Sequence, residues 1–196
     1  ECLGLAQILA LSRACKSLHK LMLNETTRAR NFWASMKGAA AWFGIKPIGH
    51  ASYHAAEGGY LSMLAYLHEH GYMWNGSVCA VAACSGHLAC LQYAHEHGCE
   101  WNEETCEAAA EKGHLACLQY AHESGCEWNE ETCEAAARGG QLHCLQYAHE
   151  NGCPWTKDTC EMAANNGKLD CLQYAHENGC EWNEETCEAA ARGGQL

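Results

Sequence analysis

Residues 105–131 read TCEAAAEKGHLACLQYAHESGCEWNEE, and nearly the same stretch recurs along the second half of the chain. The tryptophans that mark this period are evenly spaced, twenty-seven positions apart: Trp74, Trp101, Trp128, Trp155 and Trp182. A fixed period between about 20 and 50 residues predicts a stack of similar structural units. Such a stack differs from an enzyme fold, in which the catalytic residues occur once.

Each unit contains a first helix-forming stretch, here called helix A. In the unit that starts at Asn102, that residue precedes two glutamates and is a typical N-cap. The stretch 103–112 has Cys106, Ala109 and Ala110 on one face, at helical spacing. Gly113 follows and predicts the end of the helix. Small side chains on this face predict that neighbouring units approach closely.

A second stretch, helix B, covers residues 114–124, and Gly125 ends it. Leu115, Leu118, Ala121 and His122 form its expected apolar face. Helices this short are not stable alone, so the stacking of units must stabilise them. The same pattern predicts helix A at about 50–57, 77–85, 104–112, 131–138, 158–165 and 185–192, and helix B at about 60–70, 87–97, 114–124, 141–151 and 168–178.

These ranges predict an all-α chain in two parts. Residues 1–48 form an N-terminal helical segment, and residues 49–196 form a solenoid of five antiparallel helix pairs plus a sixth half-pair. Segments 126–142 and 180–196 are identical and lie two units apart, which indicates growth by duplication. Because the sequence stops within a unit, we expect it to be a piece of a longer protein.

The unit resembles the ankyrin repeat. Gly113-His114-Leu115, Leu118 and the Gly125-Cys126-x-Trp128-Asn129 run match that family's pattern, five times in register. The unit is six residues shorter than an ankyrin repeat, and the shortfall lies where ankyrin repeats carry a β-hairpin finger. It is similar to the shortened repeats abundant in giant viruses, amoebae, algae and protists. The resemblance implies reduced or absent fingers and protein binding through the helix A face.

Residues 10–33, ALSRACKSLHKLMLNETTRARNFW, are similar to the second half of an F-box, although the usual opening of that motif is absent. This resemblance implies a substrate receptor, or adaptor, of a ubiquitin ligase, in which the repeats select the target. The alternative is a helical cap that shields the apolar face of the first repeat, as solenoids require.

Charge is distributed unevenly. Residues 1–98 carry seven lysines and arginines against five acidic residues, a net charge of +2, whereas residues 99–196 carry five against nineteen, a net charge of −14. This acidity argues against nucleic acid as a partner and favours a protein with a basic surface. The sequence contains no run of 18 or more apolar residues, so it predicts no membrane span.

The sixteen cysteines fall mostly into repeat columns where a small apolar side chain is needed. We therefore expect thiols in a reducing intracellular compartment, the cytoplasm or nucleus, in preference to a ladder of disulfides. The columns are Cys79, Cys106, Cys133, Cys160 and Cys187; Cys90, Cys117, Cys144 and Cys171; and Cys99, Cys126, Cys153 and Cys180.

A histidine column could suggest zinc binding, since a cysteine lies four residues after His95 and its successors. However, a glycine separates each pair, and successive repeats should lie about 10 Å apart, too far for one zinc ion. We expect these histidines to bond the backbone of a neighbouring repeat. Because every candidate recurs in each unit, the sequence predicts no enzyme, no metal site and no cofactor. The column is His68, His95, His122, His149 and His176.

Glutamates also recur on helix A, and they are the candidate partner-binding residues. They form either a face that recognises a basic protein or a solvated face whose charges favour the helix dipole. The most direct reading is a non-catalytic protein-interaction module; the alternative is a structural scaffold or linker subunit of a larger assembly. The candidates are Glu103, Glu104, Glu107, Glu130, Glu131, Glu134, Glu161, Glu184, Glu185 and Glu188.

Overall fold

The computed structural model describes residues 50–69, 71–72, 74–181 and 184–192. The expected N-terminal segment 1–48, with its F-box resemblance or cap role, lies outside the described residues. The described helices are α3 (His50–Glu57), α4 (Leu61–Glu69), α5 (Ser77–Cys84), α6 (Leu88–Glu96), α7 (Glu103–Lys112), α8 (Leu115–Glu123), α9 (Glu130–Gly139), α10 (Leu142–Glu150), α11 (Lys157–Asn165), α12 (Leu169–Glu177) and α13 (Glu184–Arg192).

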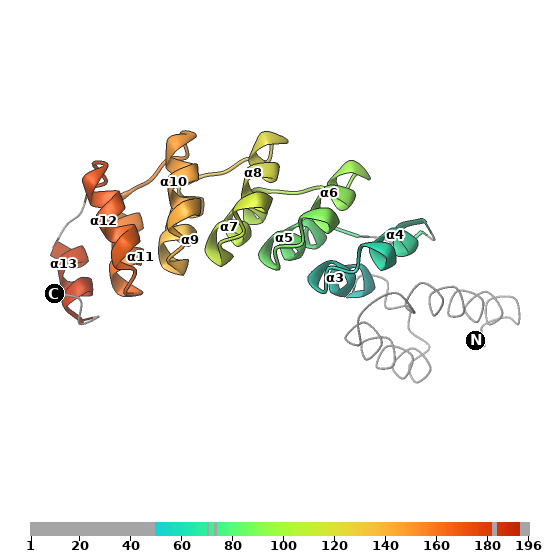
Figure 1. Cartoon of the computed structure of the whole chain (residues 1–196), viewed down its shortest axis with the longest axis horizontal. Coiled ribbons are helices and arrows are strands. Elements are labelled where there is room, and N and C mark those ends of the chain that lie inside the picture. The colour runs from blue at the N-terminus through green and yellow to red at the C-terminus, as the bar shows by residue number, and fades with distance from the viewer. Residues whose placement is uncertain (1–49, 70, 73, 182–183, 193–196) are drawn as a thin grey trace, which may run out of the picture.

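The helices form two layers that run the length of the array (Figure 1). Helix A of each repeat lies in one layer and helix B in the other, and each A helix packs against the B helix that follows it. The predicted all-α solenoid of stacked helix pairs is confirmed. The part of the chain that the structure describes contains no strand, so the fingers expected to be reduced are replaced by short extended links such as residues 126–129.

Glycine ends the helices where the sequence predicts it. Gly113 has φ of 79° in the left-handed region, and the amide of His114 donates to the carbonyl of Ala109 at 2.9 Å. Gly125 ends helix B in the same way, with φ of 85°. A glycine at this position reverses the chain without steric strain and satisfies the last carbonyls of the helix. The helix ends are therefore set by local sequence.

The N-caps of the A helices differ from repeat to repeat. The side chain of Asn129 accepts a hydrogen bond from the amide of Glu131 at 3.1 Å, and Thr156 forms a capping box with Thr159. Asn102 has the extended backbone of an N-cap, but its side chain makes no capping hydrogen bond. The predicted cap at Asn102 is therefore correct in position and wrong in the expected side-chain contact.

The A helices contact one another along the row more extensively than the B helices do. Their facing residues are small: Cys106, Ala109 and Ala110 are each completely buried. Small side chains let helix backbones approach closely, whereas bulky rings such as those of His95 and Tyr120 meet between successive B helices. The predicted close approach of neighbouring units is therefore confirmed in the A layer.

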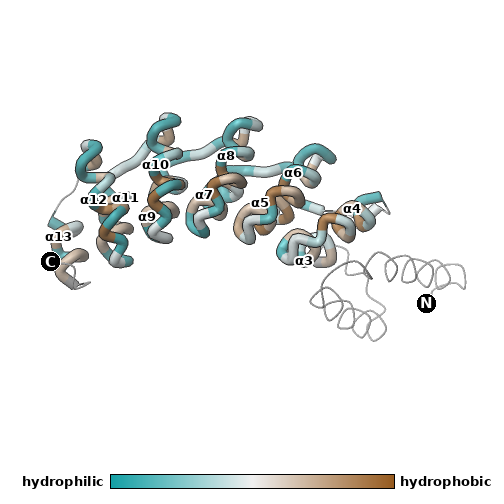
Figure 2. Tube along the Cα trace, in the orientation of Figure 1, coloured by the Kyte–Doolittle hydropathy of each residue, from teal (hydrophilic) through white to brown (hydrophobic). Residues whose placement is uncertain are grey.

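The apolar core lies where the two layers meet, and the outer ends of the B helices are hydrophilic (Figure 2). One leucine per repeat fills the centre of this core; Leu118, which is fully buried, is an example. Burying such a side chain contributes about 1.5–3 kcal/mol. Two residues of the expected stripe on helix B, Leu115 and His122, are only half-buried, and Cys117 takes the inner position instead.

Candidate partner-binding surface

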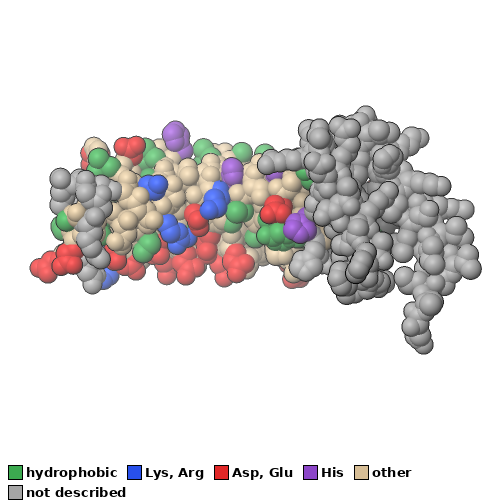
Figure 3. Space-filling view, turned by 90° about the horizontal axis from the view of Figure 1, so that it is seen from below, with side chains coloured by type: hydrophobic (Ala, Val, Ile, Leu, Met, Phe, Trp, Pro, Cys, Tyr) green, Lys and Arg blue, Asp and Glu red, His purple; other side chains and the backbone are tan. Residues whose placement is uncertain are grey.

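Carboxylates gather on one long edge of the array, over the A helices (Figure 3). Helix α7 begins with Glu103 and Glu104, and α9 begins with Glu130 and Glu131. All four side chains are exposed. Acidic residues in the first turn interact favourably with the positive end of the helix dipole, so local physics favours them here. Because α7 and α9 are neighbours in the layer, the two pairs lie in one row.

Glu107 lies one turn further along α7 and is half-buried. The pKa of its carboxyl is raised to about 7, first by burial and then by a hydrogen bond with Glu131 of the next repeat. The charges of Glu131, Glu104 and Glu103 act in the same direction. Within the described ranges, no ion pair joins either carboxyl to a basic side chain. Burial and the neighbouring carboxylates thus favour the protonated form of Glu107, and no basic side chain offsets them.

The same helix position is occupied by Glu134 in α9 and Glu161 in α11. Burial raises the pKa of Glu134, although the hydroxyl of Thr156 donates to its carboxylate at 3.3 Å and opposes the shift. Glu161 accepts a hydrogen bond from the amide of Asn165 at 3.4 Å. The column of half-buried carboxylates therefore continues across three successive A helices.

The start of α11 changes the pattern, because Lys157 and Asp158 stand where α7 and α9 each have two glutamates. The pattern of two glutamates returns in α13, where Glu184 and Glu188 are exposed. The candidate Glu185 belongs to α13, but its side chain lies outside the described residues. The structure thus brings the other candidates into one row along the A layer, with one lysine inserted in it.

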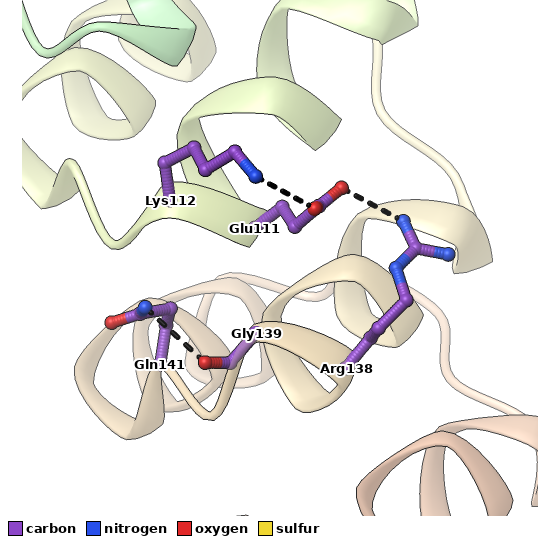
Figure 4. A network of polar contacts seen from close by, with 5 residues as sticks. All are labelled: Glu111, Lys112, Arg138, Gly139 and Gln141. Carbon is purple, nitrogen blue, oxygen red and sulfur yellow. Dashed lines mark hydrogen bonds and ion pairs between the residues drawn. The ribbon is translucent and has the colours of Figure 1, made fainter. Parts of the chain in front are cut away.

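Basic side chains border this row at the opposite ends of the A helices. Glu111 forms ion pairs with Lys112 at 3.0 Å and with Arg138 of the next repeat at 3.1 Å (Figure 4). The hydrogen bond from Lys112 and then that from Arg138 hold the pKa of Glu111 below its usual value. All three side chains remain substantially exposed. These basic groups already have an acidic partner and do not neutralise the Glu107 column.

The histidine column connects successive repeats through side chains. The Nδ1 atom of His95 lies 2.9 Å from the hydroxyl of Tyr120, and His122 makes the same contact with Tyr147 at 3.0 Å. The ring of His122 also stacks on Trp128, with centroids 3.7 Å apart. The sequence predicts that these histidines form hydrogen bonds with the backbone of a neighbouring repeat. That expectation is wrong, because their Nδ1 atoms are hydrogen-bonded to tyrosine hydroxyls of the next repeat.

The pairs of histidine and cysteine that could suggest zinc do not converge. The thiol of Cys99 donates to the carbonyl of Asn75 at 3.2 Å, whereas Nδ1 of His95 faces Tyr120. Within the described ranges, no three histidine, cysteine, aspartate or glutamate side chains are placed to hold one metal ion. The glycine between His95 and Cys99 turns the chain, which accounts for the separate directions of the two side chains.

Sequence reasoning missed the tyrosine column that pairs with the histidines. Tyr93, Tyr120, Tyr147 and Tyr174 also recur at the period of the repeat, each 25 residues after its histidine. Two polar columns of equal period are a signal of contact between repeats. The offset of 25 residues is one unit less two residues, and it places each tyrosine beside the histidine of the preceding repeat. The contact between Glu107 and Glu131 was missed for the same reason.

Comparison with solved structures identifies a similar architecture. The structure matches the crystal structure of the human ASB11 ankyrin repeat domain with a TM-score of 0.61, over 76% of this chain and 78% of that chain. The repeat array has the ankyrin fold. Sequence identity to this neighbour is 20%, so the likeness extends to the fold alone. No protein-family model and no curated protein matches the sequence.

The short helices also bear on membrane insertion. No described helix exceeds ten residues, and a membrane-spanning helix needs about 20 apolar residues. Among the residues that the structure describes, none of the helices is therefore long and apolar enough to cross a bilayer.

Proposed function

We propose that the repeat array is a non-catalytic protein-interaction module that binds a basic protein segment through the acidic face of its A helices. The ankyrin fold supports the general role, because stacked repeats present an extended surface and such arrays typically bind proteins. The row of carboxylates supports the proposal that the partner is basic. The observation that carries the proposal is the contact between Glu107 and Glu131, two carboxyls held together without an ion pair to any described basic side chain.

Retaining such a pair lowers the stability of the free protein, because like charges in a partly buried site repel each other. A lysine or arginine of a partner would relieve this repulsion and form charge-assisted hydrogen bonds with both carboxyls. The row repeats with the period of the array, so a basic segment that runs along the A layer would meet several carboxylates in succession. Complementary charge of this kind accelerates association and sets the register of binding.

The test compares two quartets of substitutions that each remove four carboxyl groups. In the first variant, Glu107, Glu134, Glu161 and Glu188 are replaced by Gln. In the control variant the exposed B-helix glutamates are replaced by Gln: Glu96, Glu123, Glu150 and Glu177. Partners are first identified by crosslinking and mass spectrometry in the native source, and the binding of each is then measured with purified components at fixed salt.

We expect the A-helix quartet to weaken binding at least about tenfold, and the B-helix quartet to weaken it by about threefold or less. Circular dichroism should show the same helix content for both variants. Equal loss of affinity in the two quartets would show that only net charge matters, and unchanged binding in the first would exclude the acidic face as the binding surface.

The finer expectation, that the chain is a substrate receptor of a ubiquitin ligase, depends on residues 1–48 and stays a proposal. Its test is whether the purified full chain binds the adaptor subunit of such a ligase. The alternative role as a permanent scaffold predicts that the chain is isolated from its source in a complex of fixed stoichiometry. A complex that exchanges within minutes would favour the receptor.

A further inference from the structure

The described repeats contain pairs of buried cysteines that lie next to each other. One cysteine of each pair lies on helix A and the other follows the glycine that ends helix B, 20 residues later. The two side chains of each pair interact, and the sulfur of Cys79 lies 3.9 Å from the carbonyl oxygen of Cys99. No side chain of this set is more than 5% exposed. The four thiol pairs are Cys79 with Cys99, Cys106 with Cys126, Cys133 with Cys153, and Cys160 with Cys180.

Further hydrogen bonds fix the geometry of each thiol pair. The thiol of Cys126 donates to the carbonyl of Asn102 at 3.2 Å, and equivalent bonds of 3.1–3.2 Å occur in the other repeats. On the other side, the sulfur of Cys133 lies 4.0 Å from the carbonyl oxygen of Cys153. Cys79 makes the same contact with the carbonyl oxygen of Cys99 at 3.9 Å, so the backbone holds both thiols in these two pairs.

We propose that each thiol pair is a redox modification site, which closes to a disulfide within its own repeat when the protein meets a small-molecule disulfide such as oxidised glutathione. The thiolate of the second cysteine attacks one sulfur of oxidised glutathione, which forms a mixed disulfide and releases glutathione thiolate. The helix A cysteine, as its thiolate, then attacks the protein sulfur of the mixed disulfide and releases the second glutathione thiolate. The two glutathione thiolates take up the two protons that the cysteines lose.

The order of these steps follows from exposure and hydrogen bonding. Cys126 is 4% exposed, whereas Cys106 is completely buried, so an oxidant reaches the second cysteine first. The hydrogen bond from the thiol of Cys106 also lowers the pKa of Cys126, and the same holds for Cys180 beside Cys160.

Closure needs only a local rearrangement. The sulfur atoms of a disulfide lie about 2.05 Å apart, so the two neighbouring thiols have to approach each other further. The second cysteine lies in the turn that follows Gly125 or its equivalent, where the backbone is not held in a helix. A disulfide is uncharged and apolar, and therefore suits a buried site better than two thiolates do.

The cysteines of the B helices provide an internal control in the same repeats. Burial raises the pKa of Cys117 to about 11, and it is the sole cause of that shift. Cys117 is 1% exposed, which is between the values for Cys106 and Cys126. The pKa of Cys106 is also raised, first by its hydrogen bond with Cys126 and then by burial. Cys106 therefore differs from Cys117 in having a second thiol of lowered pKa beside it, which can react first.

The experiment treats the native 196-residue chain with oxidised glutathione, quenches free thiols with N-ethylmaleimide at low pH, and maps the linkages by mass spectrometry after digestion. We expect disulfides that join the two cysteines of each thiol pair, with Cys117, Cys144 and Cys171 recovered as alkylated thiols. Cys126 should be modified on the order of tenfold faster than Cys117. Absence of links within repeats, or links that join B-helix cysteines at equal yield, would overturn the proposal.

A second measurement detects the intermediate. Replacing Cys106 by Ala or by Ser removes the thiol that resolves the mixed disulfide, so one glutathione should accumulate on Cys126. Circular dichroism shows which of the two variants retains the wild-type helix content, and that variant is used. Cys117→Ala is the matched control and should leave the Cys106–Cys126 disulfide unchanged. If glutathione does not accumulate on Cys126 in the folded variant, the assigned order of attack is wrong.

Discussion

The Nδ1 atom of His122 lies 3.0 Å from the hydroxyl oxygen of Tyr147, which belongs to the next repeat. Equivalent bonds join His95 to Tyr120 and His149 to Tyr174. Every bonded pair spans an interface between repeats, and neither residue finds this partner within its own unit. A solenoid is stable only through such interfaces, because its units do not fold alone.

Tyr147→Phe tests the contribution of this bond to stability. It removes the hydroxyl and leaves the ring in place, so the half-buried Nδ1 of His122 loses its partner. We expect the free energy of unfolding to fall by about 1 kcal/mol, which corresponds to a decrease of roughly 2–4 °C in Tm. Thermal unfolding followed by circular dichroism measures the change. His143→Ala, an exposed substitution on the same helix, is the control and should change stability by less than about 0.5 kcal/mol.

Stability should rise as pH falls from about 8 to about 6, and Glu107 should account for much of the rise. Because its pKa is about 7 in the folded chain and 4.5 is its ordinary value, the folded state binds the extra proton between these values. The contribution to stability is therefore full below about pH 4.5 and is lost as pH rises through 7. With a discount for partial exposure, we expect an effect on the order of 1 kcal/mol.

Chemical denaturation at several pH values measures this effect. The free energy of unfolding of Glu107→Gln should change less with pH than that of the wild type. Glu123→Gln, on helix B, should show the wild-type dependence on pH. Binding of a basic partner should show the opposite trend and weaken as pH falls, because protonation removes charge from the face. A wild-type slope in Glu107→Gln would rule out Glu107 as the source.

Thr132→Val should stabilise the protein. The hydroxyl of Thr132 is completely buried and has no hydrogen-bond partner among the described residues. An unsatisfied buried hydroxyl costs about 1–3 kcal/mol, and valine has nearly the same shape. We expect a gain of about 1 kcal/mol in the free energy of unfolding. Thr159→Val is the matched control, because Thr159 accepts a hydrogen bond from the amide of Thr156 at 3.4 Å. An equal gain in both variants would show that the hydrogen bond of Thr159 is irrelevant.

Gly113→Ala should destabilise more than Gly125→Ala. Both glycines have left-handed φ, so each alanine introduces about 1–2 kcal/mol of backbone strain. A methyl group at Gly113 would also meet the carboxamide of Gln141 in the next repeat, whereas the space at Gly125 is open. Denaturant midpoints of the two variants measure the difference. Equal midpoints would show that Gln141 moves away without cost.

Much of the fold could be predicted from the sequence, because it depends on local signals. Glycines such as Gly113 and Gly125 mark the ends of the helices, and the spacing of Cys106, Ala109 and Ala110 identifies the buried face directly. The predicted helix ranges for the A and B columns agree with the structure to within a few residues. Such features depend on neighbours in the chain, which the sequence displays.

The contacts between columns could not be predicted in the same way. Periodicity places His122 on one face of helix B, but the reach of Tyr147 from the next repeat depends on how far the B helices stand apart. The pairing of Cys106 with Cys126 depends likewise on the path of the turn after Gly125. The candidate glutamates were identified as a set, whereas the hydrogen bond between Glu107 and Glu131 depends on the separation of two A helices.

The hydrogen bond between each histidine and the tyrosine of the next repeat also bears on how such a chain changes length over generations. If residues 119–145 were lost, Leu118 would precede Gln146, and Tyr147 would take the place of Tyr120 opposite His95. The insertion of one more unit would supply a new tyrosine for the histidine before it and a new histidine for the tyrosine after it. Recombination between identical segments such as 126–142 and 180–196 therefore adds or removes whole repeats without leaving an unmatched interface. The reach of the array can evolve separately from its architecture.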